Sequence, residues 1–328
     1  MANPAVDNRL QLLIHEGESR MKAMQVIAQG ENLALQEAEV PKPNPGPGEV
    51  LIQVHAAGVT PTELVWYPTA HTTAGEKREH AIPGHEFSGV IAEVGEGVSG
   101  FAAGNAVFGM SDWFIDGATA EYCVTVPASI AVKPSTLTHE QAATVPIGAL
   151  TAWQGLFTKA KIQAGERVLV QGGSGAVGLF VVQLAKSHGA IVIATSSAEN
   201  ASLVKELGAD TVIDYKAERF EDHASQVDVV FDTVGGDTFE RSWAVLKQGG
   251  RMVTIAASAE GQQEQRVKDS FFIVEPDQQQ LVEVGKLLDA GTLKTFIKAV
   301  VPFAGAPAAY ANEPQLQRGA GKLVVKIS

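Results

Sequence analysis

The chain has 328 residues, a length that suits two domains, and apolar residues make up 45 % of it, enough for at least one sizeable core. The formal net charge of −12 would repel nucleic acids and acidic membranes, although it leaves room for a local basic pocket that holds one phosphate. Cys123 is the only cysteine, which excludes an internal disulfide and a thiolate-rich zinc site and suits a reducing cytoplasm.

The first part of the chain is expected to be an extension followed by short strands. Residues 1–21 are polar and lack the apolar segment of a secretory signal, and no run of about 18 apolar residues predicts a membrane span. From Lys22 to about Val126, short apolar stretches alternate with glycine and proline, and Gly30 and Asn32 mark a hairpin turn. Strands are predicted at 24–27, 33–37, 49–56, 88–94, 106–109 and 118–126. Short strands with many turns are typical of a partly open barrel.

The second part, after about Thr138, alternates apolar runs with helical patterns. Strands are predicted at 168–171, 191–195, 211–214, 228–232 and 251–256, and helices at 176–187, 199–207 and 280–289. This alternation is typical of an α/β fold with a doubly wound parallel sheet. Two more strands are predicted near the end of the chain, at 297–301 and 322–327.

The strongest single motif is the glycine-rich segment 171–178. Gly173, Gly175 and Gly178 match G-x-G-x-x-G, directly after a predicted strand and at the start of a predicted helix. Gly173 is expected to allow a sharp turn, Gly175 to let backbone amides approach a pyrophosphate, and Gly178 to let helix and strand pack closely. A glycine-rich turn without a ligand is the alternative. The motif predicts a dinucleotide site that includes the three glycines with Ser174, Ala176 and Val177.

The end of the next predicted strand bears on which dinucleotide binds. Sites for NAD usually place an acidic residue there, whereas this strand ends in Ser196 and Ser197, and the first acid is Glu199. Because hydroxyls can donate to a 2′-phosphate that a carboxylate would repel, the pattern favours NADPH. The serines can also serve only to cap the next helix. No Lys or Arg lies between Ser196 and Val204, so positive charge must come from elsewhere.

Further motifs together resemble the medium-chain dehydrogenase/reductase superfamily, on its zinc-free, zeta-crystallin-like quinone oxidoreductase branch. They are PGPGEVL (45–51), AAGVTP (56–61), PGHEFSG (83–89), Asn105 with VFG (107–109), LTA (150–152), the glycine-rich segment, LGAD (207–210), VIDY (212–215) and GKLV (321–324). The resemblance implies a GroES-like catalytic domain of residues 22–145 and 292–328, a Rossmann domain of residues 146–291, and an active site between them. It also implies a homodimer or homotetramer, which we expect in the cytoplasm without nucleic-acid or membrane partners.

The resemblance also bears on metal. In the zinc alcohol dehydrogenases of the superfamily, two cysteine ligands correspond to Thr60 and Ile147 here, and only His85 remains of the three-residue set. One imidazole cannot hold a catalytic zinc ion, which needs three protein ligands. We therefore expect no metal, and a hydrogen-bonded structural role for His85.

In similar NADPH quinone reductases, a Ser, a Lys and the Tyr of an Asp-Tyr pair hold the 2′-phosphate. The resemblance carries these roles to Ser196 or Ser197, to Asn200 and to Tyr215, so the family's Lys is lost at Asn200. For Tyr215, an ordinary aromatic at the end of a strand is the alternative.

The remaining cofactor assignments concern the nicotinamide half. Thr151 resembles a cofactor-contacting threonine, with packing inside a helix as the alternative. Thr233 and Val234 follow the fourth strand of the predicted parallel sheet and are expected along the nicotinamide. Phe272 is expected either to wall the nicotinamide pocket or to belong to the core.

The resemblance implies that a quinone, an enone or another α,β-unsaturated carbonyl accepts the hydride. Thr60 and Tyr67 are candidate catalytic hydroxyls: Thr60 would donate either to the nicotinamide ribose or to the substrate, and Tyr67 would donate to a developing enolate, with an aromatic on a mobile loop as the alternative. Trp66 and Trp113 are candidate substrate contacts, although Trp113 can instead fill the domain interface. Three competing readings stay open: a zinc alcohol dehydrogenase, a non-catalytic NADPH-binding protein, and an enoyl-thioester reductase.

Overall fold

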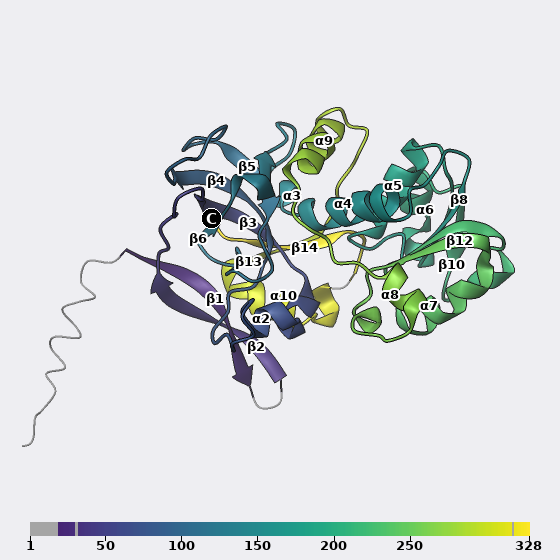
Figure 1. Cartoon of the computed structure of the whole chain (residues 1–328), viewed down its shortest axis with the longest axis horizontal. Helices are drawn as coiled ribbons and strands as arrows, with labels where there is room; N and C mark the ends of the chain where they lie inside the picture. Colours follow the sequence, from purple (N-terminus) through teal and green to yellow (C-terminus); the bar gives the residue numbers. More distant parts are fainter. Residues whose placement is uncertain (1–18, 30–31, 317) are drawn as a thin grey trace, which may run out of the picture.

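The computed structural model describes residues 19–29, 32–316 and 318–328, and it consists of two parts that lie side by side (Figure 1). One part is built on a seven-stranded, mostly antiparallel sheet with a separate hairpin, and the other on a five-stranded parallel sheet. The expected combination of a GroES-like part and a Rossmann-like parallel sheet is confirmed.

The hairpin opens the described chain. Strand β1 (Arg20–Gln29) pairs antiparallel with β2 (Asn32–Pro41) along their whole lengths. The predicted hairpin is therefore confirmed, while the turn residue Gly30 lies outside the described residues. Residues 1–18 of the predicted extension lie outside them as well, but Arg20 and Met21 belong to β1, and Met21 is buried.

The seven-stranded sheet has the order β13-β14-β3-β4-β5-β7, with β6 paired to β3. Its strands are β3 (Val50–Gly58), β4 (Glu86–Val94), β5 (Ala106–Met110), β6 (Tyr122–Thr125), β7 (Ile130–Val132), β13 (Ile297–Pro302) and β14 (Lys322–Lys326). The end strands β13 and β7 do not pair, which agrees with the expected partly open barrel. The strand predicted at 118–126 is shortened to β6, because Thr119 and Ala120 pair instead with residues of β1.

The parallel sheet has the order β10-β9-β8-β11-β12. Its strands are β8 (Arg167–Gln171), β9 (Ile191–Ser196), β10 (Thr211–Asp214), β11 (Val227–Asp232) and β12 (Leu246–Thr254). The chain moves outward from β8 to β10 and then returns to place β11 on the other side of β8. Ligands of doubly wound sheets bind at such a reversal, outside the carboxyl ends of the strands.

The helices cover the parallel sheet and the junction between the two parts. The longer ones are α4 (Pro146–Trp153), which continues as a π-helix at Gln154–Lys159, α5 (Gly178–Ser187), α6 (Ala198–Glu206), α7 (Gly236–Ser242), α8 (Gln265–Ser270) and α9 (Gln278–Asp289). Shorter helices are η1 (Pro61–Val65), α2 (Tyr67–Ala70), η2 (Pro127–Ser129), α3 (His139–Ala142), η4 (Phe220–Asp222), η5 (Trp243–Val245), η6 (Ala257–Ala259), η7 (Phe303–Gly305), α10 (Ala306–Tyr310) and η8 (Pro314–Leu316).

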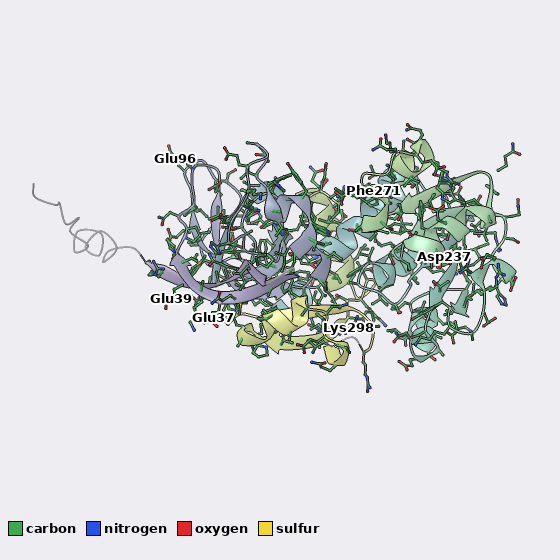
Figure 2. The ribbon with its side chains drawn as sticks, turned by 90° about the horizontal axis from the view of Figure 1, so that it is seen from below. Glu37, Glu39, Glu96, Asp237, Phe271 and Lys298 are labelled. Carbon is green, nitrogen blue, oxygen red and sulfur yellow. The ribbon has the colours of Figure 1, made fainter. Side chains whose placement is uncertain are left out.

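One hydrophobic core joins the two parts. Phe108 and Met110 of β5 belong to the same buried cluster as Leu150 of α4, Val170 of β8 and Val284 of α9. Helix α4 lies between the two sheets in Figure 1, and Figure 2 shows Lys298 of β13 where the two parts meet. The site described below lies at this junction. None of the helices in the described part of the chain is long and apolar enough to cross a membrane.

Candidate functional site

The glycine-rich loop joins β8 to α5, and its backbone geometry explains why glycines occupy it. The positive φ of +81° falls on Gly172, so the sharp turn is made there and not at Gly173, as the motif predicted. A Cβ atom on Gly173 would come within 2.9 Å of the Cβ atom of Ala194, and one on Gly178 would overlap the carbonyl oxygen of Gly172. Gly173 therefore permits packing on the sheet, and Gly178 permits the expected close approach of helix and strand.

Gly175 faces open space at the tip of the loop. A Cβ atom there would meet only the carbonyl oxygen of Gly172, at 3.3 Å. The half-exposed Ala176 and Val177 follow, and their amides donate to no acceptor among the residues that the structure describes. Amides in this position, just ahead of a helix, are available to an anion. The loop thus fits the diphosphate of a dinucleotide.

The end of β9 places a serine beside this loop. Ser197 is the N-cap residue of α6, but its side chain makes no capping hydrogen bond. Instead, Asn200 Nδ2 donates to Ser197 Oγ at 3.3 Å and to Ser174 Oγ at 3.4 Å. Ser196 is only 1 % exposed, and its hydroxyl donates to the carbonyl of Ser197. Ser197, Asn200 and Ser174 therefore form the polar surface here, while Ser196 lies behind it.

Strand β10 brings an aromatic ring and a cation to the same edge. Asp214 is in register with Ser196, and the amide of Tyr215 donates to the Ser196 carbonyl at 3.2 Å. The Tyr215 ring is 59 % exposed, and Lys216 Nζ lies 5.9 Å from its centroid. Lys216 forms no ion pair with any residue that the structure describes. Sequence reasoning missed this cation because it searched only the segment after β9, although the adjacent Asp-Tyr-Lys residues were a usable signal.

On the other side of the loop, Thr233 and Val234 follow β11. The Thr233 hydroxyl donates to the Gln171 carbonyl at 2.8 Å, and a Cβ atom on Gly172 would lie 3.1 Å from Val234 Cγ2. Asp232 fixes this turn by accepting from the amides of Val234 and Gly235. The two predicted residues thus border the start of the glycine-rich loop, with the Val234 side chain exposed.

Thr151 and Phe272 are more enclosed than the other predicted cofactor residues. Thr151 lies within α4 and is 3 % exposed. Phe272 is partly buried against the main core, and a Cβ atom on Gly155 would lie 3.3 Å from its ring. Both side chains fill the core beside the site, and little of either is open to a ligand.

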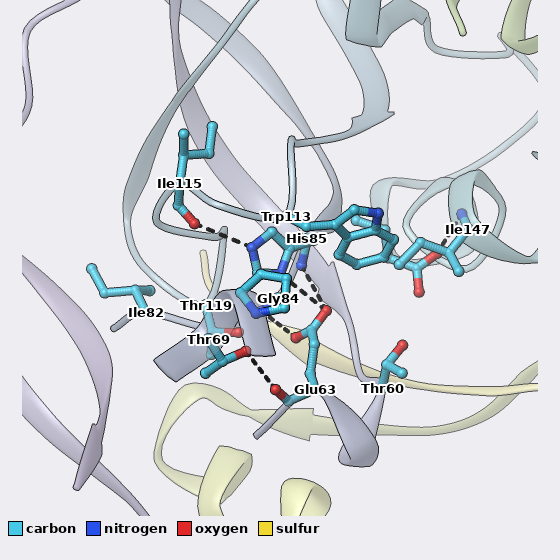
Figure 3. A network of polar contacts seen from close by, with 12 residues as sticks. Thr60, Glu63, Thr69, Ile82, Gly84, His85, Trp113, Ile115, Thr119 and Ile147 are labelled. Atoms are coloured by element: carbon cyan, nitrogen blue, oxygen red, sulfur yellow. Dashed lines mark hydrogen bonds and ion pairs between the residues drawn. The ribbon is translucent and has the colours of Figure 1, made fainter. Parts of the chain in front are cut away.

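A buried carboxylate and imidazole occupy the barrel side of the junction (Figure 3). Glu63 Oε2 accepts from the amide of Gly84 at 2.7 Å, and Oε1 lies 3.1 Å from His85 Nδ1. The other ring nitrogen, Nε2, lies 3.2 Å from the carbonyl of Ile115, which can only accept. Nε2 therefore donates to this carbonyl, while Nδ1 faces the Glu63 carboxylate as an ion pair, and both neighbours favour the imidazolium form of His85. The expected hydrogen-bonded role of His85 is confirmed.

Burial shifts the pKa of each group in this pair toward the uncharged form, but the attraction between the two charges outweighs this effect. Burial alone would raise the pKa of Glu63; the charge of His85 and the two backbone amides lower the Glu63 pKa below 4.5 instead. Burial would likewise lower the pKa of His85, but Glu63 and the Ile115 carbonyl raise the His85 pKa above 6.5. The pair is thus ionised in the middle of the pH range.

A second buried ion pair lies between Thr60 and Ile147. Lys322, at the start of β14, forms an ion pair with Glu86, and its Nζ atom donates to Thr60 Oγ1 at 3.1 Å. Glu86 Oε2 accepts from the amide of Ile147 at 3.0 Å. Lys322 and Glu86 are 5 % and 0 % exposed. The role of Lys322 was not predicted from the sequence, because nothing local to the motif at 321–324 links this residue to Thr60.

Aromatic side chains border the same region. Trp66 and Trp113 meet edge to face with centroids 5.1 Å apart, and Trp113 also lies 5.2 Å from the His85 ring. The indole N–H of Trp113 donates to the Val274 carbonyl at 3.0 Å, which fastens the barrel part to the parallel-sheet part. Tyr67 is 54 % exposed and stacks on His71. The structure therefore brings Trp66, Trp113 and His85 together, with Tyr67 at the surface.

The donors present do not fit a catalytic zinc ion. One ring nitrogen of His85 donates to the Ile115 carbonyl and the other is paired with Glu63, and the side chain of Ile147 offers no ligand atom. The Thr60 hydroxyl faces an ammonium group, which would repel a cation. Among residues 19–29, 32–316 and 318–328, no group of three or more His, Cys, Asp or Glu residues is arranged to hold a metal ion.

Comparison with known proteins places the chain among oxidoreductases. The alcohol dehydrogenase GroES-like domain matches residues 46–149, and the family described as zinc-binding dehydrogenase matches residues 207–325. A probable mitochondrial zinc-binding oxidoreductase of Arthroderma benhamiae is 32 % identical over 90 % of this chain and 93 % of its own length. The 2-methylene-furan-3-one reductase of Solanum lycopersicum is 34 % identical over 87 % of this chain and 73 % of its own. The solved quinone oxidoreductase of Coxiella burnetii has a TM-score of 0.84 at 28 % identity, covering 94 % and 100 % of the two chains.

Proposed function

Because the chain belongs to the medium-chain dehydrogenase/reductase superfamily, we propose that it is a zinc-independent, NADPH-dependent reductase of quinones, enones or related α,β-unsaturated carbonyl compounds. One observation carries the proposal. The amide of Gly321 donates to the carbonyl of Ser174 in the glycine-rich loop, and the next residue, Lys322, contacts Thr60. The dinucleotide loop and the polar site of the barrel are therefore linked through two consecutive residues.

Bound NADPH supplies the hydride, and the protein's task is to hold and orient it. The loop amides bind the diphosphate, with Gly173, Gly175 and Gly178 permitting the approach. Beside this loop, at the carboxyl end of β9, Ser197 and Asn200 contact the 2′-phosphate. The residues proposed to contact the cofactor are Gly173, Ser174, Gly175, Ala176, Val177, Gly178, Ser197, Asn200, Tyr215, Thr233 and Val234, while Thr151, Ser196 and Phe272 support the site from behind.

The positive charge for the 2′-phosphate comes from Lys216 in this proposal. The ammonium lies over the exposed ring of Tyr215, at the strand edge that Ser196 shares. It substitutes for the lysine that similar reductases have at the position of Asn200. Ser196 supports this surface from behind and does not touch the phosphate, because its hydroxyl is buried and engaged.

The substrate binds on the barrel side of the nicotinamide. Trp66 and Trp113 offer flat apolar faces to a planar quinone or enone, and the bond from Trp113 to Val274 holds that face in place. Thr60 donates a hydrogen bond to the substrate oxygen, and Tyr67 lies at the mouth of the site. We further propose that residues 22–145 and 292–328 form the catalytic domain and that residues 146–291 form the cofactor domain. The proposed assembly is a homodimer or homotetramer, and the proposed location is the cytoplasm.

The test is NADPH oxidation by the purified protein over a panel of quinones and enones, with the matched saturated ketones as controls. Oxidation with the conjugated compounds and not with the saturated ketones supports the proposal. Tight NADPH binding without oxidation by any compound would establish a non-catalytic binding protein instead. Turnover restricted to thioester enones would redirect the proposal to enoyl-thioester reduction.

A further inference from the structure

We propose that the Thr60 hydroxyl donates a proton to the substrate oxygen. Lys322 is the positioning residue: its ammonium group orients the Thr60 hydroxyl and then gives it a proton to replace the one that is lost. The inference rests on the proposed function, since it names how the same site completes the reduction. It assigns a role to a buried lysine, Lys322 of the GKLV motif, for which the motif itself indicates no function.

The geometry leaves the Thr60 hydroxyl free on one side. Its oxygen accepts from Lys322 Nζ at 3.1 Å. Thr60 is the N-cap residue of η1, yet its side chain makes no capping hydrogen bond. The hydroxyl hydrogen thus has no acceptor among the described residues, and Thr60 is half-exposed. A hydroxyl that accepts from an ammonium and has no internal acceptor is oriented to donate outward.

The ammonium is held in place by a buried counter-ion. A buried charge is costly unless it is paired and hydrogen bonded. Lys322 is paired with the fully buried Glu86, and Glu86 is fixed in turn by the amide of Ile147. This arrangement keeps a positive charge aimed at Thr60 without the reorganisation that a mobile side chain would need. Thr60 and Ile147 are also the two positions where the zinc enzymes of the superfamily carry cysteine ligands.

The step balances without a metal. The enone receives a hydride at its β-carbon, the π electrons of its C=C bond shift, and the carbonyl oxygen gains the negative charge of an enolate. The enolate oxygen takes the proton of the Thr60 hydroxyl, while Thr60 takes a proton from Lys322, which becomes a neutral amine. Water then reprotonates Lys322, and the enol converts to the saturated ketone.

The charged groups around Lys322 come from three elements. Glu86 of β4 is paired with it, Glu63 of η1 adds a second negative charge, and His85 faces Glu63. On the neighbouring strand β13, Ile297 is in register with Lys322. The next residue of β13 is Lys298, a further charged group. Burial lowers the pKa of Lys322 to about 8, and the charge of Glu63 opposes that shift. Because the donor must be protonated, kcat is expected to fall as the pH rises above about 8.

The experiment compares pH profiles of kcat for the unaltered protein and for variants of both residues. Thr60→Val removes the donor and should lower kcat about 100-fold, the lower range of general-acid catalysis, while Thr60→Ser should stay within a few-fold. Lys322→Arg keeps the positive charge beside Thr60 but cannot release a proton to it, so this variant should lose kcat toward the level of Thr60→Val and show no fall above about pH 8. Lys322→Met is made together with Glu86→Gln so that no buried carboxylate is left unpaired, and this pair should lose kcat as Thr60→Val does.

Two controls separate this idea from a structural defect and from failure of the proposed function. Calorimetric titration with NADPH should give a Kd within about twofold of the unaltered protein for every variant, and Lys326→Met on the same strand should leave kcat unchanged. An inactive unaltered protein would refute the proposed function. If the unaltered protein is active, this inference alone would be overturned by one result. That result is a Thr60→Val variant and a Lys322→Met/Glu86→Gln variant that both keep the original kcat and its decrease at alkaline pH.

Discussion

Lys322 Nζ lies 3.1 Å from Thr60 Oγ1, although the two residues are 262 positions apart in the chain. The contact joins the last strand of the protein to the short helix that follows β3. It forms only when β14 pairs with β3, so folding of the seven-stranded sheet itself creates this polar pair. The pair lies beside the dinucleotide loop because Gly321 is bonded to Ser174.

Replacing Lys216 should weaken NADPH binding selectively. Lys216→Ala removes the cation near Tyr215, and loss of one charge-assisted contact of about 1.5 to 3 kcal/mol should raise the Kd for NADPH roughly 10- to 100-fold. The Kd for NADH, which lacks the 2′-phosphate, should not change. Calorimetry with both nucleotides measures this, with Lys205→Ala on the exposed face of α6 as the matched control. Equal weakening of both nucleotides would place Lys216 elsewhere in the mechanism.

Two glycine variants should separate binding from stability. Gly175→Val puts a branched side chain where the diphosphate approaches, so it should abolish binding of both nucleotides and leave Tm nearly unchanged. Gly178→Ala should instead lower Tm, because its Cβ atom would overlap the Gly172 carbonyl oxygen. Thermal unfolding and calorimetry on both variants check this. Retained NADPH binding by Gly175→Val would mean that the diphosphate lies elsewhere.

The Glu63–His85 pair should give a pH-dependent share of stability. Glu63 has a lowered pKa, so its contribution is present above about pH 4.5 and is lost on acidification. His85 has a raised pKa, so its contribution is present below about pH 6.5 and is lost as the pH rises through its folded pKa. Glu63→Gln should therefore lower the free energy of unfolding most between these limits, by about 3 kcal/mol. Urea unfolding across pH tests this; a deficit that does not vary with pH would argue against an ionised pair.

Chelation should not affect the enzyme. The hydrogen bonds of His85 and the ammonium facing Thr60 leave no ligand set for zinc. Dialysis against a strong chelator is therefore expected to leave kcat and KM unchanged, and elemental analysis should find far less than one zinc per chain. Activity lost on dialysis and restored by zinc would contradict the donor chemistry described above.

The sequence predicted the fold well where local patterns determine it. The strands of the parallel sheet, the hairpin and the glycine-rich segment all follow from alternation and from glycine placement, and β10 was predicted at its observed bounds, Thr211–Asp214. The short helices α7 and α8 and the strand β7 escaped because they span only a few residues each. The positive φ at Gly172 also escaped, since the motif cannot say which of two adjacent glycines turns.

The site was only partly predictable, for a physical reason. Ser197 and Asn200 lie within one local segment and could be read from the order of residues. Lys216 and Lys322 enter through strand pairing, β10 with β9 and β14 with β3, and no local pattern records which side chain a neighbouring strand will deliver. Burial distinguished Ser196 from Ser197, which the sequence alone left as equivalent.

The most direct test of the whole account follows the hydride itself. NADPH deuterated at C4 of its nicotinamide is incubated with the chelator-treated protein and an enone, and the product is analysed by mass spectrometry and NMR. We expect one deuterium at the β-carbon of the saturated ketone, with the proton at the α-carbon drawn from solvent. A product without deuterium, or transfer that requires added zinc, would contradict a metal-free reduction by bound NADPH.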